Sequence, residues 1–524
     1  MTAPTSRPVL FSFTILLIAI ASAVMLTGCV STAGISPTHA LLKPSQLGAV
    51  AAPTTSSQGA DAAADASGIW PQSQWWTTYN DPVLTALIDK ALVSQPSLQT
   101  VQARLLQAQA TIDAQRSTTS PQVTGSADFT DQRYTENGII PPPLAGSIRW
   151  SADARLGIGW DLDLAGGKKA ALEAAIGQQR AALAESQVAR LALTSNVTAA
   201  YVGLARLVSL RDVAARGLNT RSQVLDLVQQ RIGAGLDTTV DLRQAQSLIA
   251  QSRVEVESID ESIARARHAL AELTGQGPDA LATLTPALRE FRSTRLPQGL
   301  PADLIGRRPD LVAARWRVEA AAQDVQVARS QFYPNVNLMA FVGLSSIGLD
   351  NFIKSGSQTY GAGPAIRLPI FDAGRLRAGL KQRAGEVDVA VDSYNASLLR
   401  ALREVADEVT TLQSLERQQR SQDDALVASE SAFELATQRY RAGLGNLLVV
   451  LTAESTMLVQ WRATAELKAR HLGSEVALIR ALGGGFRDDD TPGPSPIASK
   501  GAEPIRLAQS TQSNPRAAAP IETH

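Results

Sequence analysis

The chain has 524 residues, of which 49 are basic and 49 acidic, so its formal net charge is zero and no run of like charge indicates a nucleic-acid partner. Aromatic residues make up 5% of the chain, which suits close-packed helices better than a bulky globular core. With one cysteine, four scattered histidines, no phosphate-binding glycine loop and no G-x-S-x-G motif, the sequence predicts no enzyme, no cofactor and no metal site.

An apolar run opens the chain. Arg7 precedes residues 9–25, which are too short for a bilayer span of about 20 residues but typical of a secretory signal. Cys29 follows directly after Leu-Thr-Gly, an arrangement that resembles the bacterial lipobox, in which cleavage leaves a diacylated cysteine. We expect a signal peptide over 1–28 and lipidation of Cys29; the alternative is an ordinary signal anchor. The next residue is Val30 rather than Asp, which by the same resemblance implies the outer membrane.

Two stretches without apolar periodicity flank the body of the chain. Residues 29–68 are rich in Ala, Ser, Thr and Gly, so we expect a lipidated flexible tether there. Residues 486–524 contain closely spaced prolines and three consecutive aspartates, and we expect them to form a disordered tail.

The body of the chain contains an internal repeat. Three pairs of segments match in the same order: 96–121 with 309–334, 165–168 with 372–375, and 231–236 with 439–444. A matching order with slightly different offsets is typical of a duplication with changes in loop length. We therefore expect two hairpin-and-helix repeats, over 69–300 and 301–485.

Each repeat begins with a predicted β-hairpin. Apolar residues alternate with polar ones in four segments of about ten residues, which is the weak pattern of transmembrane β-strands. These segments are 123–129, 156–164, 336–344 and 362–370. Each hairpin could equally be a soluble pair of strands with one buried face.

A very long helix follows each hairpin. No proline occurs between Pro143 and Pro278, and apolar residues recur at steps of three and four, so residues 168–231 predict one helix of about 96 Å. Gly177, Gly203 and Gly217 are isolated, and each destabilises the helix by about 1 kcal/mol. For this segment alone, a two-stranded coiled coil is the alternative.

Four strands are too few to close a barrel, and open sheet edges cannot face lipid. The chain must therefore oligomerise, and a trimer would supply twelve strands. The predicted fold is an α+β membrane protein with four strands per chain, internally duplicated. The family resemblance given next implies that it forms a trimeric outer-membrane β-barrel continued by a long periplasmic α-helical barrel.

Three motifs then identify a family. Residues 75–88 (WWTTYNDPVLTALI), 304–311 (LIGRRPDL) and 328–334 (ARSQFYP) resemble motifs of the TolC-like outer-membrane factors, in particular the NodT/OprM-type efflux lipoproteins. The resemblance runs from about Trp70 to Gly485. It implies a homotrimer in outer-membrane lipid that works with a periplasmic adaptor and an inner-membrane pump of the RND type, as a passive exit duct for small molecules.

The two helix turns carry the expected functional residues. Glycine after a helix end permits a reversal of direction, and the resemblance implies that these turns dock the adaptor. The docking residues are Arg231, Gly235, Leu236, Arg439, Gly443 and Leu444. For the gate just beyond the tips, the resemblance implies Asp241 and Tyr440, which we expect to make polar contacts between helices. An aspartate near a helix start is equally often favoured by the helix dipole alone.

The gate departs from the family in one respect. Where relatives commonly carry aspartate after the second turn, this chain has Val449 and Thr452. An acidic ring would concentrate cations there, so we expect a more apolar constriction.

Two other functions remain open at this point. The same architecture could serve type I protein secretion rather than small-molecule efflux. A non-pore periplasmic scaffold lipoprotein is the other alternative, although two hairpin-and-helix repeats argue against it.

Overall fold

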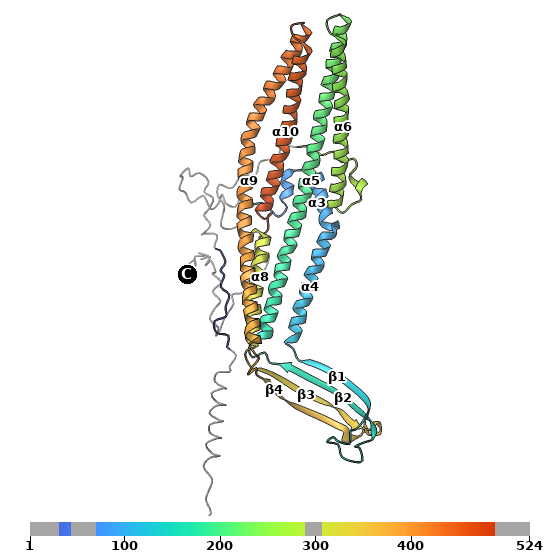
Figure 1. Cartoon of the computed structure of the whole chain (residues 1–524), viewed down its shortest axis with the longest axis vertical. Helices are drawn as coiled ribbons and strands as arrows, with labels where there is room; N and C mark the ends of the chain where they lie inside the picture. Colours follow the sequence, from blue (N-terminus) through green and yellow to red (C-terminus); the bar gives the residue numbers. More distant parts are fainter. Residues whose placement is uncertain (1–30, 43–69, 289–306, 488–524) are drawn as a thin grey trace, which may run out of the picture.

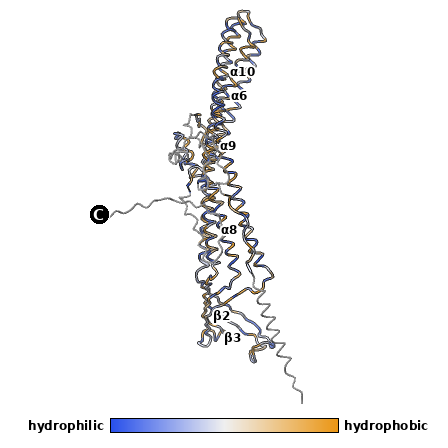
Figure 2. Tube along the Cα trace, turned by 90° about the vertical axis from the view of Figure 1, so that its left-hand side faces the viewer, coloured by the Kyte–Doolittle hydropathy of each residue, from blue (hydrophilic) through white to orange (hydrophobic). Residues whose placement is uncertain are grey.

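The computed structural model describes residues 31–42, 70–288 and 307–487. Cys29, the signal peptide, most of the tether, residues 304–306 of the second motif and nearly all of the tail therefore lie outside the described residues. The molecule is elongated, with a four-stranded sheet at one end and paired helix tips at the other (Figure 1). Turned by 90°, the helices form a narrow column that carries hydrophobic and hydrophilic residues along its length (Figure 2).

Each half of the chain contains, in the same order, a helix, two strands, a long helix and a shorter helix. The first half contains η3 (Trp75–Tyr79), α3 (Pro82–Ser94), α4 (Pro96–Thr118), β1 (Gln122–Arg133), β2 (Ile148–Asp161), α5 (Gly167–Gly233), α6 (Thr239–Leu273) and η4 (Pro278–Leu281). The second contains α8 (Pro309–Ser330), β3 (Asn335–Ile347), η5 (Leu349–Asn351), η6 (Ser355–Ser357), β4 (Gln358–Arg367), α9 (Arg375–Arg441) and α10 (Leu447–Ala481). The shared order is α4-β1-β2-α5-α6 in the first half and α8-β3-β4-α9-α10 in the second. Helices α5 and α9 have 67 residues each, and α6 and α10 have 35 each.

Helix α5 forms the spine of the molecule, and its prediction as one continuous helix is confirmed. It packs against α4 and α8 near the sheet and against α6 and α10 towards the tips. Two of its glycines lie at close crossings: a Cβ on Gly177 would come within 3.0 Å of Ala320 on α8, and one on Gly217 within 3.0 Å of Leu458 on α10. By length and composition α5 could cross a membrane, but half of its most apolar stretch is buried in the fold.

The tryptophan motif packs against the middle of α5. Trp75 and Trp76 are each 2% exposed and belong to a core cluster that includes Val197 and Leu204 of α5. The Asp81 carboxylate caps α3 and also accepts a 2.6 Å hydrogen bond from the Tyr201 hydroxyl. This first motif therefore holds the short helices against the spine.

The second motif joins three helices at the start of α8. Arg308 is 7% exposed and donates to both carboxylate oxygens of Asp310, at 3.0 and 2.8 Å. It also donates to Glu404 on α9 at 2.9 Å and to the Ala481 carbonyl at the end of α10 at 3.0 Å. A charged donor that satisfies a helix-end carbonyl stabilises that end.

The four strands form one antiparallel sheet in the order β1-β2-β3-β4. Val123 pairs with Ile158, and Leu156 pairs with Val342, so the two hairpins join through β2 and β3. Within the described chain, the outer edges of β1 and β4 have no strand partner. The expected strand ends were wrong, since β2 stops at Asp161 and β4 at Arg367. After each strand, left-handed backbone at Asp163 (φ 47°) or Ala373 (φ 55°) turns the chain towards the next helix.

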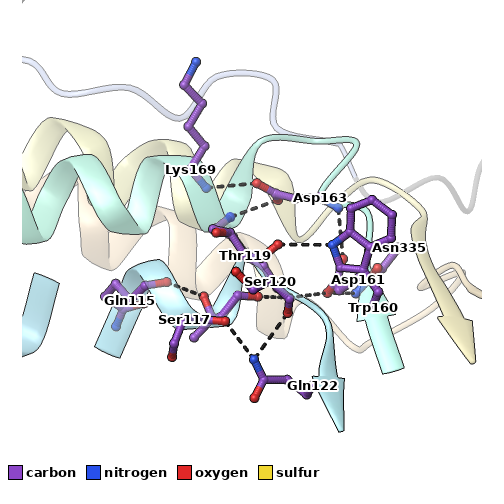
Figure 3. A network of polar contacts seen from close by, with 12 residues as sticks. Gln115, Ser117, Thr119, Ser120, Gln122, Trp160, Asp161, Asp163, Lys169 and Asn335 are labelled. Atoms are coloured by element: carbon purple, nitrogen blue, oxygen red, sulfur yellow. Dashed lines mark hydrogen bonds and ion pairs between the residues drawn. The ribbon is translucent and has the colours of Figure 1, made fainter. Parts of the chain in front are cut away.

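A polar network fixes the junction between the strands and the helices α4 and α5 (Figure 3). The Trp160 indole donates to the Thr119 carbonyl at 3.1 Å, and the Asn335 amide donates to Asp161 at 3.0 Å. The Asp163 carboxylate accepts from the backbone amides of Lys168 and Lys169, both at 2.9 Å, and so satisfies the first turn of α5. The network links β1, β2 and β3 to the ends of α4 and α5.

Residues 31–42, hereafter the N-terminal strap, lie along α9, where the sequence predicted part of a flexible tether. Thr38 donates to Asp388 through its amide at 2.8 Å and its hydroxyl at 2.9 Å. The His39 amide donates to the same carboxylate at 2.9 Å, and Asn395 exchanges hydrogen bonds with the backbone of Ala40 and Leu42. Side chains on α9 thus hold this segment in place, although its composition suggested a flexible tether.

Candidate functional site

The two helix turns lie together at the end of the molecule farthest from the sheet (Figure 1). Both are built in the same way. Gly235 has φ +73° and Gly443 has φ +74°, so glycine is favoured at each turn, and the expected left-handed reversal is confirmed. The amide of Leu236 then donates to the Arg231 carbonyl at 2.9 Å, and that of Leu444 to the Arg439 carbonyl at 2.8 Å. These bonds satisfy carbonyls that the helix ends leave free.

Apart from the two turn glycines, the predicted docking residues divide into two groups. Leu236 is 63% exposed and Leu444 is 70% exposed, and Arg439 is also exposed. Exposed leucines at a helix tip offer apolar contact area to a partner. Arg231, in contrast, turns inward, with its side chain 12% exposed. The structure therefore leaves the two leucines and Arg439 as the side chains that point outward.

Arg231 and Tyr440 bring together the two helical hairpins, one formed by α5 and α6 and the other by α9 and α10. The Arg231 guanidinium donates to Asp237 at 3.1 Å and to the Tyr440 carbonyl at 2.8 Å, and it stacks over the Tyr440 ring at 4.4 Å. The Tyr440 hydroxyl donates to the same Asp237 carboxylate. Asp237 belongs to the turn between α5 and α6, whereas Tyr440 is the next-to-last residue of α9, so the contact closes one helical hairpin against the other.

The protonation states at this contact follow from its burial and charges. Hydrogen bonding to Asp237 raises the pKa of Arg231 above its ordinary value. Burial of Tyr440, followed by its bond to the Asp237 carboxylate, raises the pKa of that phenol. At neutral pH the arginine is charged, and the tyrosine keeps the proton that it donates.

An apolar cluster lies immediately behind the contact. Tyr440 is 1% exposed and packs with Val224 and Val228 of α5 and with Leu447 and Val450 of α10. The polar groups at the tip are therefore backed by a dry interface on the side that faces the rest of the molecule.

Asp241 is used inside its own turn. Its carboxylate accepts from the Thr238 amide at 2.9 Å and the Thr238 hydroxyl at 2.7 Å, while the Asp241 amide donates back to that hydroxyl at 3.4 Å. This reciprocal arrangement is a capping box at the start of α6. The bonds from Thr238 lower the pKa of Asp241. Of the two expected gate residues, Tyr440 contacts the other hairpin, whereas Asp241 bonds to Thr238.

Val449 and Thr452 lie on the first two turns of α10. The Val449 amide is capped by the Asn446 side chain at 3.1 Å, and the Thr452 hydroxyl donates to the Leu448 carbonyl at 2.8 Å. The side chain of Val449 is 55% exposed, and Thr452 is also exposed. They present an apolar and a neutral polar group, respectively.

Sequence reasoning missed Asp237. It lies between a turn glycine and the Thr238 cap, where an aspartate is common in any turn, so nothing in the local pattern singles it out. Its partner Tyr440 is 203 residues away. Among the residues that the structure describes, no group of three His, Cys, Asp or Glu side chains could hold a metal ion.

Comparison with known proteins gives a consistent result. The sequence matches the model of the family described as outer membrane efflux protein over residues 87–276 and 300–484. It is 30% identical to the multidrug resistance outer membrane protein MdtP of Shigella flexneri over 474 residues, which cover 89% of this chain and 95% of MdtP. The crystal structure of the outer membrane protein VceC from Vibrio cholerae is similar, with a TM-score of 0.75 and 37% identity over 80% of this chain and all of VceC. The outer-membrane channel OprN has the same TM-score at 29% identity and covers 83% of this chain and 98% of OprN.

Proposed function

The chain belongs to the outer membrane efflux protein family, and from this membership we propose how its two hairpins assemble, dock and open. It is an outer-membrane protein that acts as an efflux duct. The observation that carries the proposal is the contact of Tyr440 with Arg231 and Asp237, which closes the two helix tips against each other at the end opposite the sheet.

The duct is a homotrimer. Three copies join edge to edge through β1 and β4, whose outer edges have no partner within the described chain. Twelve strands then form a closed barrel. Inside the bilayer, each backbone N–H and C=O group of this barrel can then bond to a neighbouring strand. Each copy supplies two duplicated repeats, 69–300 and 301–485, and Cys29 carries the lipid anchor.

The exposed tips dock a periplasmic adaptor, which connects the duct to an inner-membrane pump of the RND type. Leu236, Leu444 and Arg439 provide the docking side chains, and their exposure supports this role. The cargo consists of small molecules. The name of MdtP, which speaks of multidrug resistance, favours such a cargo over secreted proteins.

The gate consists of Tyr440, Arg231 and Asp237, with Asp237 rather than Asp241 as its acidic member. Opening separates Tyr440 from the other two residues, and the adaptor would stabilise that open state by binding the separated tips. Val449 and Thr452 line the constriction beside the gate and make it less acidic than an aspartate ring would.

Conductance of the purified protein in planar bilayers tests the gate. Asp237→Asn keeps the size of the side chain but removes the charge that holds Tyr440 and Arg231, and hydrogen bonds to charged groups contribute about 1.5–3 kcal/mol. We expect a higher resting conductance than in the wild type. Tyr440→Phe, which removes a single hydroxyl, should change the conductance in the same direction.

Asp241→Asn is the matched control. It alters a nearby aspartate whose carboxylate, in the contacts described above, accepts hydrogen bonds from Thr238 and none from the other hairpin. Its resting conductance should equal that of the wild type. If Asp241→Asn opens the duct and Asp237→Asn does not, the gate assignment is wrong. A wild-type protein that runs as a monomer and never conducts would refute the duct itself.

A further inference from the structure

A buried ion pair joins α5 to α10 well behind the gate. The Arg221 guanidinium donates to Glu454 at 3.1 Å, and the two side chains are 16% and 1% exposed. Arg221 lies twelve residues before the end of α5, which places it about 18 Å from the turn. Burial raises the pKa of Glu454, while the charge of Arg221 acts in the opposite direction. We call these two residues the pivot pair.

The same guanidinium also binds α6. It donates to the Ser252 hydroxyl at 2.6 Å and to the Leu248 carbonyl at 3.2 Å. Ser252 is 4% exposed, and its hydroxyl donates in turn to the Leu248 carbonyl at 2.9 Å. One arginine therefore ties three helices together at a single level.

In the neighbouring turns, α5 and α10 approach each other closely, and α9 joins the contacts. Gly217, one turn before Arg221, is where a Cβ would come within 3.0 Å of Leu458, one turn after Glu454. Arg216 stacks over Trp461 of α10 at 4.8 Å, and the Trp461 indole donates to Glu430 of α9 at 2.7 Å. All four helices of the tip region are thus tied at this level.

If the two helical hairpins separate, the consequences differ between the tip and the pivot pair. At the tip, Arg231 and Asp237 belong to the same hairpin, so their ion pair survives when Tyr440 moves away. At the pivot pair, the two charges belong to different hairpins, so separation of the hairpins there would break the ion pair itself. The apolar cluster around Val228 and Val450 also stands between the pivot pair and the water at the tip.

We propose that Arg221 and Glu454 form the pivot of the gate, so that the tips part beyond this pair while the helices stay together at and behind it. The proposal rests on the proposed function, because it presumes a duct that opens at its helix tips. Both members are positioning residues: they limit how far down the helices the separation runs, and they do not close the aperture.

Conductance in two gate backgrounds tests this role. Arg221→Met with Glu454→Met replaces both charges by apolar groups of similar length and leaves no charge unpaired. With the wild-type gate, we expect no change in resting conductance, because Tyr440 still closes the tips. In the Asp237→Asn background, we expect a larger conductance than that of Asp237→Asn alone, because the separation runs further along the helices.

A second ion pair on the same two helices provides the matched control. Arg206 on α5 donates to Glu466 on α10 at 2.7 Å, but the side chains are 35% and 41% exposed. Arg206→Met with Glu466→Met should change conductance in neither background. If the double variant of the pivot pair does not fold, Glu454→Gln takes its place, with the same expected direction.

Spin-label distances test the pivot independently of conduction. In a Cys29→Ser background, labels at Ala234→Cys and Ala442→Cys report on the tips, and labels at Arg206→Cys and Glu466→Cys report on the far side of the pivot pair. Introducing Asp237→Asn should lengthen the first distance and leave the second unchanged. With the pivot pair replaced as well, the second distance should also lengthen.

Each remaining outcome decides the question. A conductance that rises when the pivot pair is replaced behind a wild-type gate would make the pair part of the gate and overturn the proposal. The proposal would also be overturned if replacing the pivot pair changed the conductance in neither background. The same holds if Asp237→Asn alone lengthened the distance between the labels at positions 206 and 466. A protein that never conducts refutes the duct, and the distances then decide the pivot on their own.

Discussion

At the residue scale, Tyr440 carries the contact between the hairpins, and its partners come from a turn two hundred residues away. The sequence could predict the left-handed glycines of both turns, because a glycine after a helix end has a local cause. It also predicted a polar contact for Tyr440. It could not select Asp237 over Asp241, because both are aspartates of one turn and only the fold decides which one faces α9.

The capping box gives a testable dependence on pH. Because Thr238 lowers the pKa of Asp241 in the folded protein, the carboxylate stabilises the fold above its unfolded pKa of about 3.9, and this contribution is lost as the pH falls through the lowered folded value. We expect Asp241→Asn to lower the free energy of unfolding by about 1 kcal/mol at pH 7. Thermal melts should show the difference shrinking below about pH 4.

Asp423→Asn serves as the control for this series. Asp423 is exposed on α9 and accepts a hydrogen bond from Gln419 at 2.8 Å on the same helix. Its replacement should change the melting temperature little at any pH. An Asp241→Asn deficit that persists undiminished in acid would contradict the linkage between this carboxylate and stability.

At the element scale, glycines that look alike in the sequence have different surroundings on α5. Gly177 and Gly217 lie where α8 and α10 cross the helix closely, whereas a Cβ on Gly203 would meet nothing within 4 Å. The length of α5 could be predicted because the absence of proline and the apolar period are local properties. The role of each glycine could not, because it depends on a helix that packs against it from elsewhere in the chain.

Substitution of these glycines should therefore have opposite effects. Gly217→Val forces side-chain atoms against Leu458 and should destabilise the protein by about 1–3 kcal/mol. Gly203→Ala on the same helix should be stabilising by up to about 1 kcal/mol, because alanine is the better helix former. Denaturant unfolding followed by circular dichroism measures both.

The close crossing can be checked directly with a second substitution. Leu458→Ala opens the space that the new valine needs, so it should destabilise the Gly217→Val protein less than the wild type. Equal losses in the two backgrounds would show that Gly217 and Leu458 are not coupled.

At the scale of the whole molecule, the two long helices, the two hairpins and the order of the motifs could all be predicted, because each leaves a periodic or repeated pattern in the sequence. The N-terminal strap could not. Its residues show no periodicity, and the side chains that hold it lie about 350 residues away on α9. An extended segment that is bound by another element carries no local pattern of its own.

Hydrogen exchange should reveal how the strap is held. Burial acts to raise the pKa of Asp388, but the hydrogen bonds from His39 and Thr38 outweigh it, so the net pKa is lowered. Asp388→Ala should speed exchange of the Thr38 and His39 amides, because it removes their acceptor. In the wild type, the protection of the same amides, measured relative to their intrinsic exchange rates, should fall as the pH is lowered and Asp388 becomes protonated.

Asp407→Ala is the comparison for this experiment, since Asp407 pairs with Arg403 on the exposed surface of the same helix. It should leave exchange in the strap unchanged. Slow exchange of Thr38 and His39 in Asp388→Ala would mean that other contacts hold the strap.

The equal lengths of α5 and α9 constrain how this molecule can change. One residue inserted into α5 alone would advance its turn by about 1.5 Å and rotate it by about 100°, so Arg231 would no longer meet Tyr440. The two turns end level because both helices contain the same number of residues. Viable length variants should therefore alter both helices together and by nearly whole turns, so that the two turns stay level and Arg231 stays opposite Tyr440.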